Sequence, residues 1–387
     1  MHSTLRNGVL IVGGGIAGIT LAIALAQRGI KARLVEKQSE WKPTSSGIFI
    51  YSNGLGVMDK LGLLGGIIST GWASFDGRNP YLDRQGRLIV EYFYPRVAGD
   101  HVPAIVGIKR AELHRVLIDA LHRTDVEVRL GTTVASLVDG EYGAEAAFSD
   151  GSSGVFDAVV AADGIRSQLR AMVFGPLEPT FTGFGAWRSI HRKPDAIDSK
   201  IMMMGVGKRL GIMPISQDRL YVFATSNEPG NPWYDPARWH ITMREKFEEF
   251  NGPATALLDE IVAPEQVVYT AVEEVHCPLP WNKGRVLLVG DAAHASSPFM
   301  GQGGAMALED ALVLSEMLAR GGPVAETLAA FGERRYERCN FVQEASRKVG
   351  EAGGLETDEA CKLRDQRMRS AGQQGVDAFY ERMAQPL

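Results

Sequence analysis

The sequence lacks several features that would have indicated particular classes of protein. Its three cysteines, Cys277, Cys339 and Cys361, show no CxxC pair or metal-ligand spacing, so nothing predicts a disulfide framework or a zinc site. Charge of either sign is not in excess, with 41 Lys and Arg against 46 Asp and Glu, which argues against nucleic-acid or polybasic membrane binding. The absence of GxSxG and P-loop patterns leaves hydrolase and kinase interpretations without support.

The remaining composition is that of an ordinary globular enzyme. The chain has 387 residues, of which 45% are hydrophobic and 22% charged, enough for one large or two smaller cores. The eight histidines form no metal-binding pattern. We therefore expect small-molecule partners and a reducing cytoplasm, with no nucleic acid, metal or membrane.

One uncharged run near the N-terminus has two interpretations. The residues from Gly8 to Ala26 could form a signal peptide or a membrane span. A glycine cluster, however, divides the run into a β-branched segment, Val9 to Val12, and a helical segment from Ile16 to about Arg28. Strand, turn and helix are therefore the favoured interpretation.

The turn between that strand and helix matches a dinucleotide-binding pattern. Gly13, Gly15 and Gly18 form GxGxxG, which allows a tight turn, close approach of a pyrophosphate to the backbone, and close helix packing. The next predicted strand, Lys31 to Glu36, ends in a carboxylate that would accept hydrogen bonds from a ribose. FAD and NAD share this ADP half, so the pattern alone does not distinguish them.

Three further segments are placed where predicted strands and helices meet. A helix is predicted that begins with the segment Ile108 to Leu113 and runs to about His122. The hydrophobic run Val155 to Ala162 indicates one buried strand that ends at Asp163 and Gly164. The segment GDAAHASSPFMGQGG, residues 290–304, joins a predicted strand, 285–289, to an apolar helix that runs to about Leu318. The last segment has the composition of a second nucleotide loop.

These four segments together resemble one family. The sequence contains, in this order, GxGxxG followed by Glu, then RxxL, then DGxxS, then GDAAHxxxPxxGQG. This series of motifs resembles that of the single-component FAD-dependent aromatic hydroxylases, the para-hydroxybenzoate hydroxylase group. The resemblance covers the chain from Val9 to about Leu318. It implies that the late loop is the second half of one FAD site.

The resemblance also implies roles for individual residues. Asp291 would bind the ribityl chain, Pro298 would lie against the isoalloxazine, and Arg110 would contact the pyrophosphate. The segment 41–47 contains Lys42 where the family often has an arginine shortly before the glycine matched to Gly47. The complete set expected to bind FAD, with Asp163 and Gly164 also near the nicotinamide cofactor, is Gly13, Gly15, Ile16, Ala17, Gly18, Glu36, Lys37, Gly47, Arg110, Val134, Asp163, Gly164, Asp291, Pro298, Gly301, Gln302, Gly303 and Gly304.

The fold implied is α/β: a Rossmann-type FAD-binding domain of the GR2-like, para-hydroxybenzoate hydroxylase type, interleaved with a β-sheet substrate domain. A hairpin is predicted over Gly77 to Tyr94 with its turn at 83–86, and strand-like alternation over 180–228. We expect the FAD-binding domain at 1–76, 100–176 and 280–345, the substrate domain at 77–99 and 177–279, and a C-terminal helical tail at 346–387.

The substrate site is expected on the second sheet. Arg209 and Tyr221 occupy places similar to an Arg and a Tyr that hold the substrate in flavin-dependent urate hydroxylase, but Phe299 stands where that enzyme has an acidic residue. Arg209 is equally compatible with a surface charge. The candidate substrate residues are Arg209, Met213, Tyr221, Phe223 and Phe299, and the candidate catalytic residues are Pro298, Arg209 and Tyr221.

His294 and the run Met202 to Met204 each have both a structural and a functional interpretation. His294 titrates in the range of a general base, but a hydrogen-bonding role in its loop is favoured. The run Met202 to Met204 indicates core packing more than a substrate surface.

The reaction implied by the resemblance is a hydroxylation. NADPH or NADH would reduce the FAD, O2 would add at flavin C4a, and the distal oxygen would pass to an electron-rich carbon of an aromatic or N-heteroaromatic substrate. The alternatives are a flavoenzyme of the same fold acting on a polycyclic or non-aromatic substrate, a nicotinamide-only dehydrogenase, and a non-catalytic flavin-binding protein. A monomer or homodimer is expected.

Overall fold

The first of two large sheets holds the predicted glycine turn. The computed structural model describes residues 5–42, 46–140 and 142–387. In these ranges a six-stranded sheet has the order β18-β19-β12-β1-β2-β8, parallel except at β18. Its strands are β1 (Val9–Val12), β2 (Ala32–Glu36), β8 (Glu127–Leu130), β12 (Ala158–Ala161), β18 (Asn282–Lys283) and β19 (Val286–Leu288).

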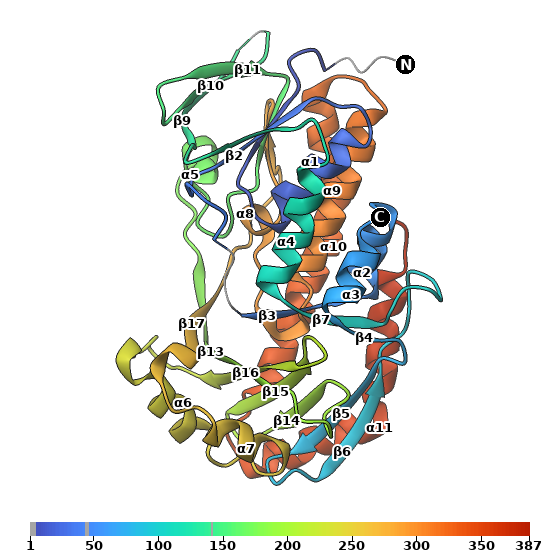
Figure 1. The fold of residues 1–387 in the computed structure, drawn as a ribbon, viewed down its shortest axis with the longest axis vertical. Coiled ribbons are helices and arrows are strands. Elements are labelled where there is room, and N and C mark those ends of the chain that lie inside the picture. Colours follow the sequence, from blue (N-terminus) through green and yellow to red (C-terminus); the bar gives the residue numbers. More distant parts are fainter. Residues whose placement is uncertain (1–4, 43–45, 141) are drawn as a thin grey trace.

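Helices of this part pack beside the sheet. The helix α1 (Ile16–Ala26) follows β1 and contacts both α4 (Arg110–Leu121) and α9 (Gly303–Ala319) (Figure 1). Because α1 is buried from Gly18 to Leu25, the uncharged N-terminal run lies in the core of the protein. No helix among the described residues is long and apolar enough to cross a membrane.

The run from Val155 to Ala162 is not one strand, as the sequence predicted. It divides at Asp157 into β11 (Ser153–Phe156), which pairs with β10 (Ala144–Phe148), and β12, which pairs with β1. The reason is that the Asp157 carboxylate accepts hydrogen bonds from the backbone N–H groups of Asn7 and Gly8, at 2.7 and 3.0 Å. The chain therefore passes from a small sheet, completed by β9 (Val134–Asp139), into the large one.

The second large sheet has seven strands in the order β17-β13-β16-β15-β14-β5-β6. The hairpin predicted at 77–94 is present as β5 (Arg78–Asp83) and β6 (Leu88–Phe93), and β5 pairs with β14, more than a hundred residues later. The other strands are β13 (Thr180–Arg192), β14 (Ile201–Met204), β15 (Lys208–Pro214), β16 (Arg219–Asn227) and β17 (Val267–Glu274).

The two faces of this sheet have different surroundings. One face packs on α6 (Trp239–Phe247) and α7 (Pro253–Asp259), where Met203 joins a separate hydrophobic core. All three methionines of the 202–204 run are buried, as the sequence predicted. Since side chains alternate along a strand, Met202 points to the other face and also lines a cavity there. That second face points toward the six-stranded sheet and its helices (Figure 1).

The remaining elements connect or cover these sheets. The three-stranded sheet β3-β7-β4 lies between the two large sheets in Figure 1. The elements not yet given bounds are β3 (Gly47–Tyr51), β4 (Trp72–Ser74), β7 (Ile105–Lys109), α2 (Ser52–Lys60), α3 (Leu64–Thr70), α5 (Gln168–Phe174), α8 (Asp291–His294), α10 (Val324–Gly353) and α11 (Asp358–Met383).

The boundary expected between residues 345 and 346 falls inside a continuous helix. The helix α10 runs past it to Gly353, because its buried face, which includes Ser346 and Gly350, continues across that point. Beyond a short connection, α11 contacts β6 at the edge of the seven-stranded sheet (Figure 1). The C-terminal residues therefore form part of the sheet's cover.

A buried network of charges joins α9 to α10. Asp310 of α9 accepts a hydrogen bond from Arg335 of α10 at 2.8 Å, and Arg335 also pairs with Glu309 at 2.9 Å. All three side chains are at most 1% exposed. The second oxygen of Asp310 accepts the backbone N–H of Gly290 at 2.9 Å, so the network fixes the end of the loop that follows β19.

We predict that Arg335→Met destabilises the protein by about 3 kcal/mol, because it leaves two buried carboxylates short of their cation. Urea unfolding of the FAD-loaded protein measures the change. The matched control is Arg347→Met on the same helix, whose half-exposed side chain pairs with Glu274 and whose loss should cost less than about 1 kcal/mol. Equal losses for the two variants would show that the network is not a principal source of stability.

Candidate functional site

The turn after β1 opens into a cavity of about 350 Å³, here called the glycine-turn cavity. The Glu36 carboxylate stands over the turn and accepts the Gly14 N–H at 2.7 Å. Trp41 and His114 also line this cavity, although no sequence pattern indicated them, and they pack edge to face with ring centres 5.5 Å apart. The predicted residues that line it are Gly15, Ile16, Ala17, Glu36, Arg110, Gly164, Asp291, Gly303 and Gly304.

The glycines of the turn serve different purposes. A Cβ added at Gly18 would lie 2.0 Å from the carbonyl oxygen of Gly13, so a side chain there would push α1 away from the turn. Gly13 has a φ of +111°, which favours glycine. A Cβ at Gly15 would meet no protein atom within 4 Å, so the space in front of this residue is open to a ligand.

A second cavity, of about 580 Å³, continues from the first. We call it the proline-loop cavity, because Pro298 and Gly301 of the 290–304 loop line one side of it. Four residues line both cavities: Arg110, Asp291, Gly303 and Gly304. The two cavities therefore form one groove that extends from Glu36 to Pro298, although the residues at its two ends are more than 250 positions apart in the sequence.

The polar groups along this groove suit FAD. Helices α1 and α9 both begin at it with no side-chain cap on their first N–H groups, which leaves those donors and the positive helix ends available to an anion. Asp291 begins α8 and is exposed between the two cavities, where a carboxylate can accept hydroxyl hydrogen bonds. Gly47 lies directly against Tyr221: a Cβ added to Gly47 would be only 2.4 Å from the Tyr221 ring. The residues present thus fit a pyrophosphate, a polyhydroxyl chain and a flat ring in series.

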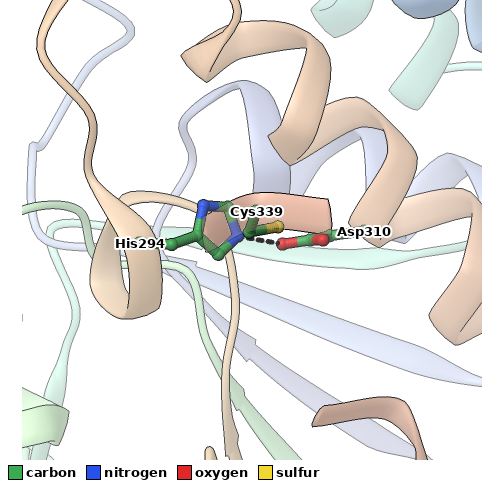
Figure 2. A group of neighbouring side chains, drawn as sticks. All are labelled: His294, Asp310 and Cys339. Atoms are coloured by element: carbon green, nitrogen blue, oxygen red, sulfur yellow. Dashed lines mark hydrogen bonds and ion pairs between the residues drawn. The ribbon is translucent and has the colours of Figure 1, made fainter. Parts of the chain in front are cut away.

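His294 belongs to a buried cluster with Asp310 and Cys339, in which a hydrogen bond joins His294 to Asp310 (Figure 2). Burial by itself lowers the pKa of His294, but the neighbouring Cys339 and Asp310 outweigh burial and raise this pKa well above its usual value. His294 is consequently a charged partner of Asp310 at 2.7 Å, which supports the structural role and not that of a base. Because Asp310 already accepts from Gly290, His294 and Arg335, the cluster is a hydrogen-bonding centre and not a metal site.

The seven-stranded sheet presents Arg209, Tyr221 and Phe223 to the proline-loop cavity. Arg209 is only 7% exposed, which excludes the surface-charge interpretation. Its guanidinium lies 4.6 Å over the ring of Phe299, and its Nε is 3.4 Å from the Thr225 hydroxyl. Burial lowers the pKa of Arg209 to about 10, and the neighbouring tyrosines offset this effect only in part.

A third cavity, of about 670 Å³, adjoins the second and was not indicated by the sequence. We call it the tyrosine cavity, since Tyr51, Tyr81, Tyr94 and Tyr380 line it around Lys200. These residues come from separate segments without a shared motif, so only the folded chain brings them together. Phe299 lines this cavity, whereas Tyr221 does not.

Several predicted residues lie away from the three cavities. Lys37 is exposed, Val134 is buried at the start of β9, and Met213 is packed in the core against Gly107. Asp163 accepts hydrogen bonds from Ser167 and Leu169 at the start of α5. Gln302 is buried and links Asn53 to the Tyr380 hydroxyl.

The segment proposed to replace the family's arginine is described only in part. Lys42 lines the glycine-turn cavity and pairs with Glu40 at 2.9 Å, with both side chains largely exposed. Residues 43–45 of that segment lie outside the described residues.

Comparisons with known proteins agree with this geometry. The family model described as FAD binding domain matches residues 6–343. The chain is 33% identical over 369 residues to 2-heptyl-3-hydroxy-4(1H)-quinolone synthase of Pseudomonas aeruginosa, covering 93% of each protein. It is 32% identical over 354 residues to FAD-dependent urate hydroxylase of Mycolicibacterium vanbaalenii, covering 88% of this chain and 87% of the other.

Among solved structures, the chain is similar to Klebsiella pneumoniae HpxO complexed with FAD and uric acid. The TM-score is 0.88 and the identity 26%, over 98% of both chains. The α/β fold expected from the sequence is thus confirmed.

We predict that Gly15→Ala lowers FAD affinity by roughly tenfold without changing the melting temperature, because the new methyl group meets only the space reserved for the ligand. FAD retention is measured by the fluorescence of released flavin, and stability by thermal unfolding of the apoprotein. Gly18→Ala is the matched comparison and should lower stability by about 2 kcal/mol through its clash with Gly13. Wild-type FAD retention in Gly15→Ala would contradict the assignment of this space to the cofactor.

Proposed function

The chain belongs to the FAD-binding-domain family of FAD-dependent monooxygenases, and from this membership we propose that it hydroxylates an aromatic or N-heteroaromatic small molecule with NADPH or NADH and O2. The observation that carries the proposal is the continuous groove, in which Arg110, Asp291, Gly303 and Gly304 each line both cavities. A nicotinamide-only dehydrogenase would need the glycine-turn cavity but has no use for the 290–304 loop at the other end.

Different residues of the groove would bind different parts of the cofactor. The amides before α1 and Arg110 would bind the pyrophosphate, Glu36 the adenosine ribose, and Asp291 the ribityl chain. Pro298 and the 301–304 backbone would lie against the isoalloxazine, where the start of α9 favours negative charge on the ring. When bound, FAD supplies the redox chemistry, accepting hydride from the nicotinamide cofactor and activating O2.

The sheet side of the groove would hold the substrate. The buried Arg209 guanidinium can donate to a polar atom of the ring being hydroxylated, and Phe223 and Phe49 provide apolar walls that exclude water. Tyr221 stacks on Phe223 with ring centres 5.3 Å apart, and the near edge of the Tyr221 ring lies against Gly47. An electron-rich ring positioned by these groups would face the flavin edge.

The relatives support a ring substrate but not one particular compound. Their names refer to a quinolone and to urate, both of which are fused nitrogen-containing rings. Phe299 lines the adjoining tyrosine cavity, with its ring centre 4.9 Å from that of Phe184, and this apolar side chain favours a substrate less polar than urate.

The setting of the protein is also a proposal. Cys277, Cys339 and Cys361 are all buried and unpaired, which supports a reducing compartment, and we place the enzyme in the cytoplasm as a monomer or homodimer.

The direct experiment measures NAD(P)H oxidation by the FAD-loaded protein against hydroxybenzoates, hydroxypyridines, hydroxyquinolines and purines, with hydrogen peroxide quantified in parallel. We expect one ring class to stimulate oxidation with little peroxide and to gain one oxygen in mass. For that substrate, Arg209→Lys should raise KM on the order of tenfold with FAD still bound, because lysine lacks the planar donor fork. The control Arg219→Lys changes an exposed residue of β16. If FAD-loaded protein oxidises NAD(P)H equally with and without every compound, the proposal is wrong.

A further inference from the structure

The tyrosine cavity connects the flavin-facing pocket with the protein surface. Its floor is the face of the seven-stranded sheet, and its roof is formed by α10 and α11. Phe49, Arg209 and Phe223 line both this cavity and the proline-loop cavity, so the two are neighbours with Arg209 at their junction. A ligand held beside the flavin can therefore extend into the tyrosine cavity.

The inner end of the cavity contains a second buried cation. The side chain of Lys200 is 5% exposed and its Nζ donates a hydrogen bond to the Tyr51 hydroxyl at 2.8 Å. The ammonium also lies 4.6 Å from the ring centre of Phe49 and 5.3 Å from that of Tyr94. Aromatic faces attract a cation but do not neutralise it.

Neither buried cation has a carboxylate partner among the residues that the structure describes. Across residues 5–42, 46–140 and 142–387, Lys200 and Arg209 bind hydroxyl and carbonyl oxygens and form no ion pair. Burial and the charge of Arg209 accordingly lower the pKa of Lys200 to about 7. Since uncompensated buried charge is costly, two such cations on one cavity wall are best explained by an anion that arrives with the ligand.

Hydroxyl groups around Lys200 would complete an anion site. The Tyr51 hydroxyl accepts the Lys200 hydrogen bond and can donate its own hydrogen to a ligand. The Tyr94 hydroxyl likewise accepts a hydrogen bond, from Asn79 Nδ2 at 3.1 Å, and can donate its own hydrogen to a ligand. Because burial raises the pKa of both tyrosines well above its usual value, both remain protonated donors beside an anion.

The outer part of the cavity has a different character. Its walls include Phe341 and Val349 of α10 and Val376 and Phe379 of α11, and the exposed charged residues Glu344, Lys348 and Arg382 also line it. The lining residues at the far end are exposed, among them Gly375, so the cavity opens to solvent between the two helices. An apolar corridor that leads from a cationic site to the surface suits a ligand with an apolar extension.

We propose that the substrate is an amphipathic aromatic acid: an anionic group of the ring is bound by Lys200 and Arg209, and an apolar chain runs between α10 and α11. This proposal rests on the proposed function, because the ring must lie beside the flavin. It adds a class of compound, ring acids or acidic hydroxyaromatics with an alkyl arm, and identifies Lys200 as a residue that determines specificity.

The test is calorimetric titration of the FAD-loaded protein with three compounds: 4-octylbenzoate, 4-octylbenzamide and benzoate. We expect the octyl acid to bind at least about tenfold tighter than its neutral amide, since charge-assisted hydrogen bonds are lost in the amide. It should also bind about a hundredfold tighter than benzoate, which buries no chain. Calorimetry detects binding without turnover, so failure here is distinct from failure of hydroxylation.

Two variants locate the two parts of the ligand. Lys200→Met should remove most of the preference for acid over amide, and Lys200→Arg should restore it. Gly375→Phe should weaken the octyl acid about tenfold but benzoate little, because a Cβ at Gly375 meets no protein atom within 4 Å and the new ring enters the corridor. The control Gly65→Phe changes a helical glycine of α3 that is equally unhindered and lines none of the three cavities.

Three results would overturn the proposal. These are equal affinities for the acid and the amide, an acid preference that Lys200→Met leaves intact, and no measurable binding of the octyl acid at millimolar concentration to protein with a full complement of FAD. Loss of octyl-acid binding in Gly65→Phe as well as Gly375→Phe would assign the effect to general helix damage and would equally remove the support for the corridor.

Discussion

The buried carboxylate of Asp310 is the constraint on which the site depends. It accepts hydrogen bonds from the Gly290 backbone, from His294 and from Arg335, and so ties the loop after β19 to α8 and α10 at one point. Opposing charges keep the pKa of Asp310 low, at about 2, despite its burial. Asp291 follows directly after this anchor, and the two cavities of the groove meet at its side chain. The Asp310 cluster has no part in the proposed reaction, but it fixes the position of the loop that lines the groove.

The arrangement separates two tasks between the two large sheets. The six-stranded sheet and the helices α1 and α9 supply backbone donors and positive helix ends, which suit a phosphate-containing cofactor of fixed structure. The seven-stranded sheet supplies the side chains of Arg209 and Tyr221, and Lys200 directly precedes its strand β14; these side chains suit a variable substrate. Because the 290–304 loop, which follows β19, lines one cavity together with residues of the seven-stranded sheet, the substrate side can change in sequence while the cofactor side keeps its geometry.

The cofactor side was largely predictable because its determinants are local. The glycine turn, Glu36 and the strand-loop-helix at 286–319 each lie within a short segment, so the local residue pattern is enough to predict the strand, turn and helix there. Prediction was wrong where a distant contact decides the outcome, as at Asp157, whose carboxylate binds Asn7 and Gly8 and breaks the predicted strand. It gave no indication of the tyrosine cavity, because Tyr51, Lys200 and Tyr380 come from three regions and Tyr380 lies on a polar helix without a motif.

The central claim is that one groove holds one FAD molecule from Glu36 to Pro298, and a crystal structure of the FAD-loaded protein tests it most directly. The account predicts the adenosine ribose at Glu36, the ribityl chain at Asp291, and the isoalloxazine in the proline-loop cavity within contact of Pro298 and Arg209. A flavin ring located outside that cavity, with Asp291 free of ligand contacts, would contradict the account.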